Sequence, residues 1–376
     1  MSTLRLPLTL SAALLTSTSL VSAEVPSVAA DIAPVHSLVA RVMDGVGAPN
    51  LVIPAGASPH EYNLRPSEAE ALQNADLVFW IGEDLTPWLE DAVETLAANA
   101  SVTTLLDADG IELLDFRENA LFEAHDHSSH GDDHDDHDHH DEHAHDDHDH
   151  DHDEHAHDDN GHDHDEHAHD DHEHDHDEHA HDDHDDDHDE HAHDDHGHDD
   201  HEGHAHGEHD PHAWLSIENA QTWLNVIAGQ LSAADPDNAG AYFANASAAR
   251  DELAALQAEV AGLLDPVRGG RFIVFHDAYQ YFEDSFDFPA SGAISLGDAV
   301  DPSPARIAEI QGRIADEGVD CVLSEPQFNP GLVETVLDGT EASTGVMDPL
   351  GSAFEPGPGL YPQVIRGIAT TLVGCF

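Results

Sequence analysis

A run of histidine and acidic residues divides the chain. It extends from His125 to His209 and holds 33 of the 37 histidines. The heptapeptide DEHAHDD recurs in it with a period of 12 residues, beginning at Asp141, Asp153, Asp165, Asp177 and Asp189. A solenoid needs apolar side chains to stack its repeats, and this repeat offers none larger than alanine. It also lacks the glycine and the spacing of an EF-hand loop. We therefore expect the metal-free run to be a disordered insertion, because it buries too little apolar surface to offset chain entropy.

The charge of the chain limits its partners. The sequence has 80 acidic residues against 10 basic ones, all of them arginine, and 40 of the acids lie between Glu123 and Asp210. A surface this acidic repels the phosphates of nucleic acids and of anionic lipids. Nucleic acids and anionic membrane surfaces are therefore excluded as partners.

The N-terminus has the pattern of a secretory signal. One positive side chain, Arg5, precedes an apolar stretch from Leu6 to about Leu20, and the small residues Val21-Ser22-Ala23 follow. We predict a cleaved signal peptide over residues 1–23 and a periplasmic protein. The apolar stretch is too short and too often interrupted to span a bilayer. No cysteine lies near the cleavage point to carry a lipid, so we expect no membrane anchor.

The two cysteines form an even pair in a chain that carries an export signal. Disulfides persist in exported proteins, so we predict a bond between Cys321 and Cys375. A metal-binding thiol pair is the alternative, but structural zinc thiolates usually come in fours or with close spacing. The bond would fix the C-terminal segment 367–376 to the preceding fold.

Apolar strand-like runs alternate with helix-period segments on both sides of the insertion. The runs are 51–54, 76–82 and 102–106 before it, and 271–276, 321–325 and 342–348 after it. The helical segments are 35–43, 67–74 and 86–97, then 303–316, 330–337 and 361–372. This alternation is typical of parallel βαβ units. The fold class is therefore α/β, with two lobes that each hold a parallel sheet and flanking helices.

One long amphipathic helix joins the two predicted lobes. The segment Asp235–Leu264 begins with Asp-Pro, has apolar residues at helical spacing and stops near Pro266. A single rigid helix between two lobes leaves a cleft, and we expect the metal site there. The predicted domain limits are 24–234 for the N-terminal lobe, including the insertion at 125–209, then 235–264 for the helix and 265–376 for the C-terminal lobe.

Four histidines lie outside the insertion. His276 ends a strand-like run, His60 lies in a loop after another, and His212 precedes a helix. Ligands of open α/β sheets bind beyond the carboxyl ends of strands, so these three imidazoles can converge across the cleft. A surface or hydrogen-bonded histidine is the alternative for each of them. His36, at the start of a predicted helix, is better explained by a structural role.

Five segments, in order, resemble a known family. They are GASPHEYNLRPSEAEALQNADLVFWIG, DPHAWLSIENA, RFIVFHDAYQYFE, CVLSEPQFNP and VMDPLG. Together they resemble the zinc-specific substrate-binding proteins of bacterial metal ABC importers, over essentially the whole chain apart from the signal and the insertion. The resemblance implies two α/β lobes bridged by a long helix, in a periplasmic protein that passes Zn²⁺ to a transmembrane permease. It also implies zinc ligands at His60, His212 and His276. We expect a monomer without enzymatic activity.

The fourth ligand of the implied site stays open. Some zinc members of the family use a glutamate immediately before the first ligand histidine, and this sequence has Pro59 there. The fourth position is then a water or a carboxylate. Asp348 is the first candidate, because the corresponding aspartate is a ligand in manganese-binding relatives. Glu61 and Glu325 are weaker candidates.

The donor set favours zinc. Three neutral imidazoles with at most one oxygen suit tetrahedral zinc, whereas manganese prefers oxygen-rich sites. The manganese relatives have glutamate where this chain has His276. A manganese importer component, a periplasmic zinc chaperone or buffer, and a surface adhesin are alternative functions. A zinc hydrolase is a remote one, because three histidines also describe a catalytic zinc, but the chain has no HExxH motif outside the insertion.

The insertion offers paired imidazoles beside carboxylates, so we predict many weak zinc sites in it. Ordering a flexible chain costs entropy, which weakens each site, while their number raises the local zinc concentration. A solubilising repeat with incidental metal affinity is the alternative. The paired histidines are His143, His145, His155, His157, His167, His169, His179, His181, His191 and His193.

Overall fold

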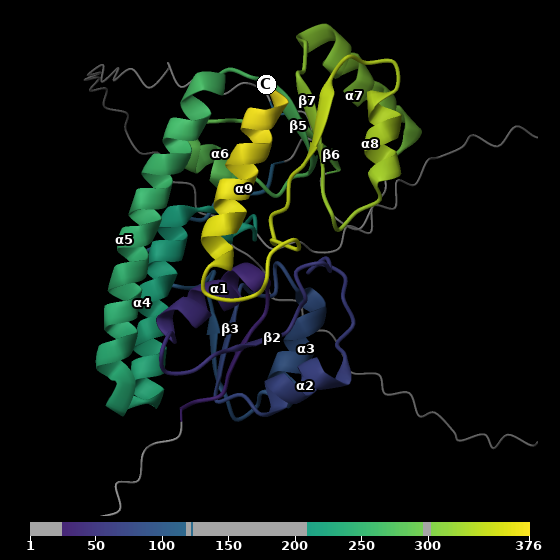
Figure 1. Ribbon diagram of the computed structural model, residues 1–376. Coiled ribbons are helices and arrows are strands. Elements are labelled where there is room, and N and C mark those ends of the chain that lie inside the picture. Colours follow the sequence, from purple (N-terminus) through teal and green to yellow (C-terminus); the bar gives the residue numbers. More distant parts are fainter. Residues whose placement is uncertain (1–24, 118–121, 123–208, 296–301) are drawn as a thin grey trace, which may run out of the picture. The chain divides into compact units, whose positions relative to one another are not determined.

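The computed structural model describes residues 25–117, 122, 209–295 and 302–376, which belong to one compact unit (Figure 1). The predicted signal peptide and the residues of the insertion up to 208 lie outside this part of the chain. Among the described residues, no helix has the length and apolar character needed to cross a membrane.

The first sheet has four parallel strands in the order β2-β1-β3-β4. Its strands are β1 (Val28–Ala30), β2 (Asn50–Leu51), β3 (Leu77–Trp80) and β4 (Ser101–Thr104). The connecting helices are α1 (Ala33–Val42), α2 (Pro66–Gln73) and α3 (Pro87–Leu96). Each helix has a proline in its first turn, where the missing backbone N–H costs no hydrogen bond.

The second sheet repeats this arrangement, with parallel strands in the order β6-β5-β7-β8. Its strands are β5 (Phe272–His276), β6 (Gly292–Ser295), β7 (Cys321–Ser324) and β8 (Ser343–Val346). Its helices are α6 (Gln280–Phe286), α7 (Pro304–Glu317) and α8 (Pro330–Leu337). Two parallel sheets with flanking helices confirm the predicted fold class.

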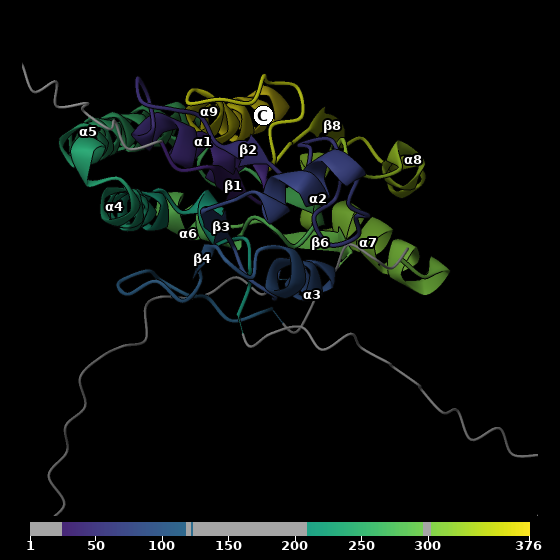
Figure 2. The ribbon, with the colours of Figure 1, turned by 90° about the horizontal axis from the view of Figure 1, so that it is seen from below.

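Three longer helices pack together beside the two sheets, and one of them, α5, extends past both lobes (Figures 1 and 2). They are α4 (Ile217–Ala234), α5 (Ala239–Leu264) and α9 (Leu360–Cys375). Helix α5 packs against α4, α1 and α9. Exposed ion pairs at 2.7 Å join it to α1 through Arg41 and Glu252, and to α9 through Arg366 and Glu259. The predicted long helix is therefore present, beginning at Ala239 after a short 3-10 turn at Pro236–Asn238.

The two sheets share one hydrophobic core. A single cluster of buried side chains includes Phe79 of the first sheet and Phe272 of the second, together with the buried faces of α4, α5 and α9. Helix α9 contacts the first lobe directly, because the backbone N–H of Tyr361 donates to Ser37 Oγ at 2.9 Å. A smaller core lies between β5, β6 and β7 and the helices α7 and α8. The predicted domain limits cross the shared core and stay predictions.

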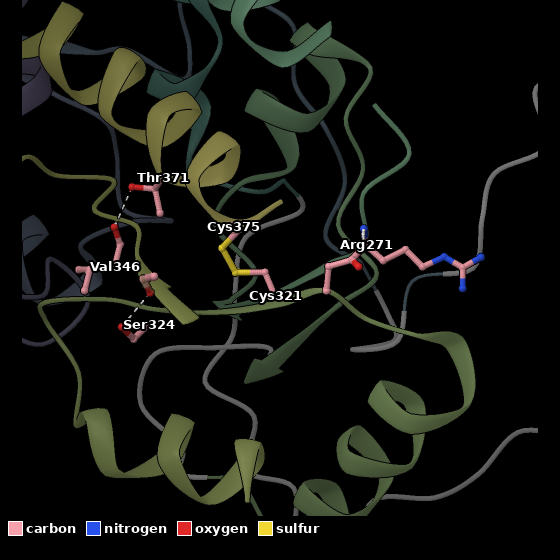
Figure 3. The surroundings of a disulfide bond; sticks show 8 residues. Arg271, Cys321, Ser324, Val346, Thr371 and Cys375 are labelled. Carbon is pink, nitrogen blue, oxygen red and sulfur yellow. Dashed lines mark hydrogen bonds between the residues drawn. A yellow bond between two sulfur atoms is a disulfide. The ribbon is translucent and has the colours of Figure 1, made fainter. Parts of the chain in front are cut away.

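The predicted disulfide is confirmed. Cys321, the first residue of β7, is bonded to Cys375 at the end of α9 (Figure 3). Thr371 of the same helix donates a hydrogen bond to the carbonyl of Val346 in β8 at 3.0 Å. The disulfide therefore fixes the last turn of α9 to the inner strand β7 of the second sheet, as the sequence suggests.

Candidate metal centre

Three histidines from three different connections meet at one point. His60 lies in the loop after β2, His212 precedes the short 3-10 turn Ala213–Leu215 at the start of α4, and His276 is the last residue of β5. One nitrogen from each ring lies within 4.8 Å of the other two. Within residues 25–117, 122, 209–295 and 302–376, this is the one group of three or more histidine, cysteine or acidic side chains whose ligand atoms lie that close together. The structure therefore brings together the three histidines proposed as ligands.

The spacing of two of these histidines fits a metal ion. Nε2 of His212 and Nε2 of His276 are 3.4 Å apart. Two nitrogens that each lie about 2.0–2.1 Å from a tetrahedral zinc ion are separated by roughly 3.3 Å. The ring of His60 completes the group, with its centroid 5.4 Å from that of His212 and 6.3 Å from that of His276.

In His212 and His276, the ring nitrogen that points away from the other histidine, Nδ1, lies within hydrogen-bond distance of a carboxylate. Nδ1 of His212 lies 2.6 Å from Asp210 Oδ1, and the backbone N–H of His212 donates to the same oxygen at 3.0 Å. Nδ1 of His276 lies 2.7 Å from Glu325 Oε1, which also accepts from the backbone N–H of His276 at 3.3 Å.

These contacts decide the form of the two imidazole rings. Each of these carboxylate oxygens already accepts a hydrogen bond from a backbone N–H, so it also accepts one from the ring, and we assign the ring proton to Nδ1 in both histidines. Both Nε2 atoms then carry lone pairs, and these lone pairs face each other. The same arrangement orients histidine ligands in metal sites generally, because the outer partner fixes the ring and its tautomer.

Burial keeps the imidazole of His276 in the form that binds metal. The side chains of His212 and His276 are 6% and 5% exposed, and their carboxylate partners are 2% and 1% exposed. Burial lowers the pKa of His276 to about 3, and the negative charge of Asp210 opposes this shift only partly. A neutral imidazole is the ligand form, so His276 is ready for a metal ion without losing a proton.

Mostly apolar side chains surround the three histidines. The pocket around them is lined by Trp214, Phe328, Pro349 and Leu350, together with Ser58, Pro59, Glu325 and Gln327. Two tryptophans brace its walls: Trp214 Nε1 donates to the carbonyl of Pro349 at 2.9 Å, and Trp88 Nε1 donates to that of Pro59 at 2.7 Å. Low polarity strengthens the attraction between a cation and the nearby carboxylates.

Comparison with known proteins identifies the family. Residues 28–375 match the family described as ZnuA, the periplasmic component A of a zinc-uptake complex. The chain belongs to the ZnuA family. This confirms the resemblance drawn from its five segments.

Two relatives in the ZnuA family match over nearly their whole length, and both are called high-affinity zinc uptake system protein ZnuA. The protein from Brucella abortus is 43% identical over 357 residues, which are 95% of this chain and 93% of the relative. The protein from Paracoccus denitrificans is 43% identical over 369 residues, 98% of this chain and 97% of the relative.

Solved structures show the same fold. A zinc-bound deletion mutant of ZnuA has a TM-score of 0.62 at 17% identity, covering 94% of this chain and 98% of that one. The binding protein FpvC of Pseudomonas aeruginosa, in complex with Mn²⁺, has a TM-score of 0.62 at 18% identity, with the same coverage. At this identity the likeness concerns the fold alone.

The structure places the candidates for a fourth ligand outside the histidine group. Asp348 uses Oδ1 to accept from the backbone N–H of Leu350 and Gly351, and Oδ2 to accept from the backbone N–H and hydroxyl of Ser352, all within 3.0 Å. Glu325 lies beside Nδ1 of His276, on the far side of that ring from Nε2. Glu61 is exposed. All three carboxylates stand apart from the close group of described residues.

A buried ion-pair cluster beside the site was not foreseen from the sequence. The side chain of Arg117, 15% exposed, lies 2.8 Å from Glu283 and 3.3 Å from Asp277, the neighbour of His276. Burial raises the pKa of Asp277 to about 8, and Arg117 opposes the shift. Nothing in the sequence singles out Arg117, because its partners lie about 160 residues away along the chain.

The chain segments on either side of residues 118–208 lie next to each other. Asp115 and His209 form an antiparallel bridge, and the backbone N–H of Asp210 donates to the carbonyl of Leu114 at 2.8 Å. Tyr281 of α6 donates to the carbonyl of Asp210 at 2.8 Å. These contacts fix Asp210, which in turn holds His212. The sequence analysis did not single out Asp210, although its place two residues before a candidate ligand is a signal for it.

The remaining histidine assignments concern residues that are not part of the three-histidine group. His36, in α1, is buried, and its Nε2 lies 3.2 Å from the carbonyl of Pro49. The ten paired histidines of the insertion, from His143 to His193, lie outside the described residues.

Proposed function

We propose that this protein captures Zn²⁺ in the periplasm through His60, His212 and His276 and delivers it to an ABC-type permease. The observation that carries the proposal is the pair of Nε2 atoms that face each other at 3.4 Å. Each belongs to a ring whose Nδ1 is hydrogen-bonded to a buried carboxylate. Two lone pairs directed at one point repel each other unless a cation lies between them. The relatives named as high-affinity zinc uptake proteins support zinc as that cation.

The same donor set supports zinc over manganese. Three imidazoles leave room for about one more ligand in a tetrahedral site, whereas manganese prefers more oxygen donors and a higher coordination number. The carboxylates nearest the site are engaged with histidine Nδ1 atoms and backbone N–H groups. Zn²⁺ is therefore expected to displace Mn²⁺ from the protein in direct competition.

The geometry favours binding over catalysis. A zinc hydrolase needs a base near the open coordination position. Glu325, the base considered for such a reaction, is bound to Nδ1 of His276 and is 1% exposed. We therefore propose a binding protein, without enzymatic activity, that works as a monomer.

We further propose that the insertion collects zinc weakly for this site. Deleting residues 125–209 and measuring zinc uptake in cells under chelation tests this role. The expected result is slower uptake at low zinc and normal uptake when zinc is plentiful. Equal uptake by both strains at every zinc level would show that the insertion has no such role.

The zinc site itself is tested by calorimetry on a chain that lacks residues 125–209, so that weak sites do not obscure the signal. We expect one tight zinc site per chain, and its loss in the variant His60→Ala, His212→Ala, His276→Ala. The matched control is His36→Gln, which alters a buried histidine outside the site and should keep the zinc site intact. Tight binding that survives the triple replacement would refute the proposal.

A further inference from the structure

Gln327 connects three loops around the candidate metal centre. It lies after β7 and lines the pocket together with the three histidines. Its side-chain nitrogen Nε2 donates to the carbonyl of Ala55 and to Asp348 Oδ1, both at 3.1 Å. A carbonyl and a carboxylate of this kind accept hydrogen bonds, so the nitrogen of the amide has to face them. The orientation of the Gln327 amide is therefore determined by its partners.

The first of these hydrogen bonds joins the two lobes. Ala55 belongs to the loop that carries His60, whereas Gln327 and Asp348 follow β7 and β8 of the second sheet. Asp348 is itself held by backbone N–H groups of its own turn, so it offers a fixed anchor. The amide of Gln327 thus ties the His60 loop to the lobe that supplies His276.

The second half of the amide has no partner within the described residues. Oε1 of Gln327 is buried, and no described group hydrogen bonds to it. A buried amide oxygen left without a donor costs about 1–3 kcal/mol, so such atoms usually meet a water or a ligand. Because Nε2 faces Ala55 and Asp348, Oε1 points to the other side of the planar group.

A metal held by three histidines supplies a donor of the right kind. Zinc in a three-histidine site takes a fourth ligand, and none of the carboxylates considered for that place joins the histidine group. A zinc-bound water is a strong hydrogen-bond donor, because the metal lowers its pKa. An acceptor in the lining of the same pocket would orient such a water, as outer partners orient other ligands.

We propose that Gln327 is a positioning residue for the metal: its Nε2 holds the His60 loop, and its Oε1 accepts a hydrogen bond from the water in the fourth coordination position. This inference rests on the proposed zinc site. It assigns the fourth position to water and gives Asp348 the task of holding Gln327, in place of ligating the metal.

The direct test is a crystal structure of the zinc-loaded wild-type protein. The expected result is a water bound to zinc and within hydrogen-bond distance of Gln327 Oε1. A carboxylate of Asp348, Glu325 or Glu61 in the fourth position would overturn the proposal, and so would a zinc-bound water without contact to Gln327.

The functional test uses Gln327→Met, which keeps the length of the side chain and removes both polar atoms. Zinc affinity, measured by competition with a chelator, should fall about 10- to 100-fold, as for other outer partners of metal ligands. The visible spectrum of the Co²⁺-loaded variant should also change, because the ligand field reports the fourth ligand. The matched control is Gln363→Met in α9, an exposed amide that donates to the carbonyl of Gly359 at 2.7 Å.

The outcomes separate this inference from the function on which it rests. If Gln327→Met keeps the affinity and the spectrum of the wild type, the inference is wrong while the zinc site stands. If the wild-type protein shows no tight zinc site, or the triple histidine variant retains it, the proposed function itself fails. A loss of stability alone would leave the Co²⁺ spectrum unchanged, which also counts against the inference.

Discussion

Replacing Glu325 by glutamine separates zinc affinity from the stability of the fold. In the structure one oxygen of Glu325 accepts from Nδ1 of His276 at 2.7 Å and from the backbone N–H of His276 at 3.3 Å. The side chain is 1% exposed. Glutamine has the same shape and can still present an oxygen to both donors, so the substitution Glu325→Gln removes mainly the negative charge behind the ligand.

The magnitude follows from this role. Removing an outer partner of a histidine ligand weakens metal binding by about 10- to 100-fold, or roughly 1.4–2.7 kcal/mol. We place Glu325→Gln near the lower figure, because the hydrogen bond is retained in its neutral form. Glu325→Met should approach the upper figure, because it leaves the Nδ1–H of His276 buried without an acceptor. The metal-free fold should tolerate glutamine well, since burial already raises the pKa of Glu325 and so disfavours its charged form.

Two measurements on each variant test this reasoning: zinc affinity by chelator competition, and thermal unfolding of the metal-free protein. The matched control is Asp235→Asn, because Asp235 is also buried and accepts from Tyr242 at 2.9 Å and Asn238 at 2.7 Å, but in the turn between α4 and α5. That variant should lose stability and keep its zinc affinity. Wild-type zinc affinity in Glu325→Met would refute the role assigned to the carboxylate.

Three further predictions concern stability. Burial raises the pKa of Asp31 to about 7, so the stability that Asp31 contributes is present below pH 4 and is lost as the pH rises through 7. Urea unfolding of the metal-free protein between pH 5 and 8 should show that Asp31→Asn removes roughly 2–3 kcal/mol of this loss. The same pH dependence of the unfolding free energy in the wild type and in Asp31→Asn would contradict the shift. Replacing Cys321 and Cys375 by serine opens a link across 54 residues, worth about 4 kcal/mol, and should lower the unfolding temperature while zinc affinity persists. Arg117→Met leaves two buried carboxylates without their cation and should cost about 3–5 kcal/mol by the same assay, with partial rescue by Arg117→Lys.

The sequence was sufficient for most of the fold because its strands and helices have a clear period. It did not indicate β1, β6 or α6. Strand β1 has the sequence VAA and β6 has GAIS, so each holds one strand-favouring residue, Val28 or Ile294, among small residues that do not favour strands. Both strands are fully buried, so tertiary packing, not local preference, makes them strands. Helix α6 has only seven residues, too short to show a helical period.

The candidate site likewise has some parts that the sequence predicts and others that it does not. The three histidines could be predicted because only four lie outside the insertion and because family motifs surround them. The partner of His276 could not, since its hydrogen bond with Glu325 joins residues 49 positions apart, whereas Asp210 lies only two residues before His212. Asp348 stays a candidate ligand: its position in the motif suggests that role, and in the structure its oxygens accept hydrogen bonds from its own turn and from Gln327.

The order in which the site forms follows from how firmly each histidine is held. His212 and His276 are buried, each fixed by a carboxylate, and both belong to elements packed in the shared core. His60 is less buried and lies on a loop. A large rotation of one lobe against the other would have to open that core, which α5 and α9 help to form from both sides. If these histidines bind zinc as proposed, we expect metal capture to need mainly the ordering of the His60 loop onto His212 and His276, which keeps its entropic cost low.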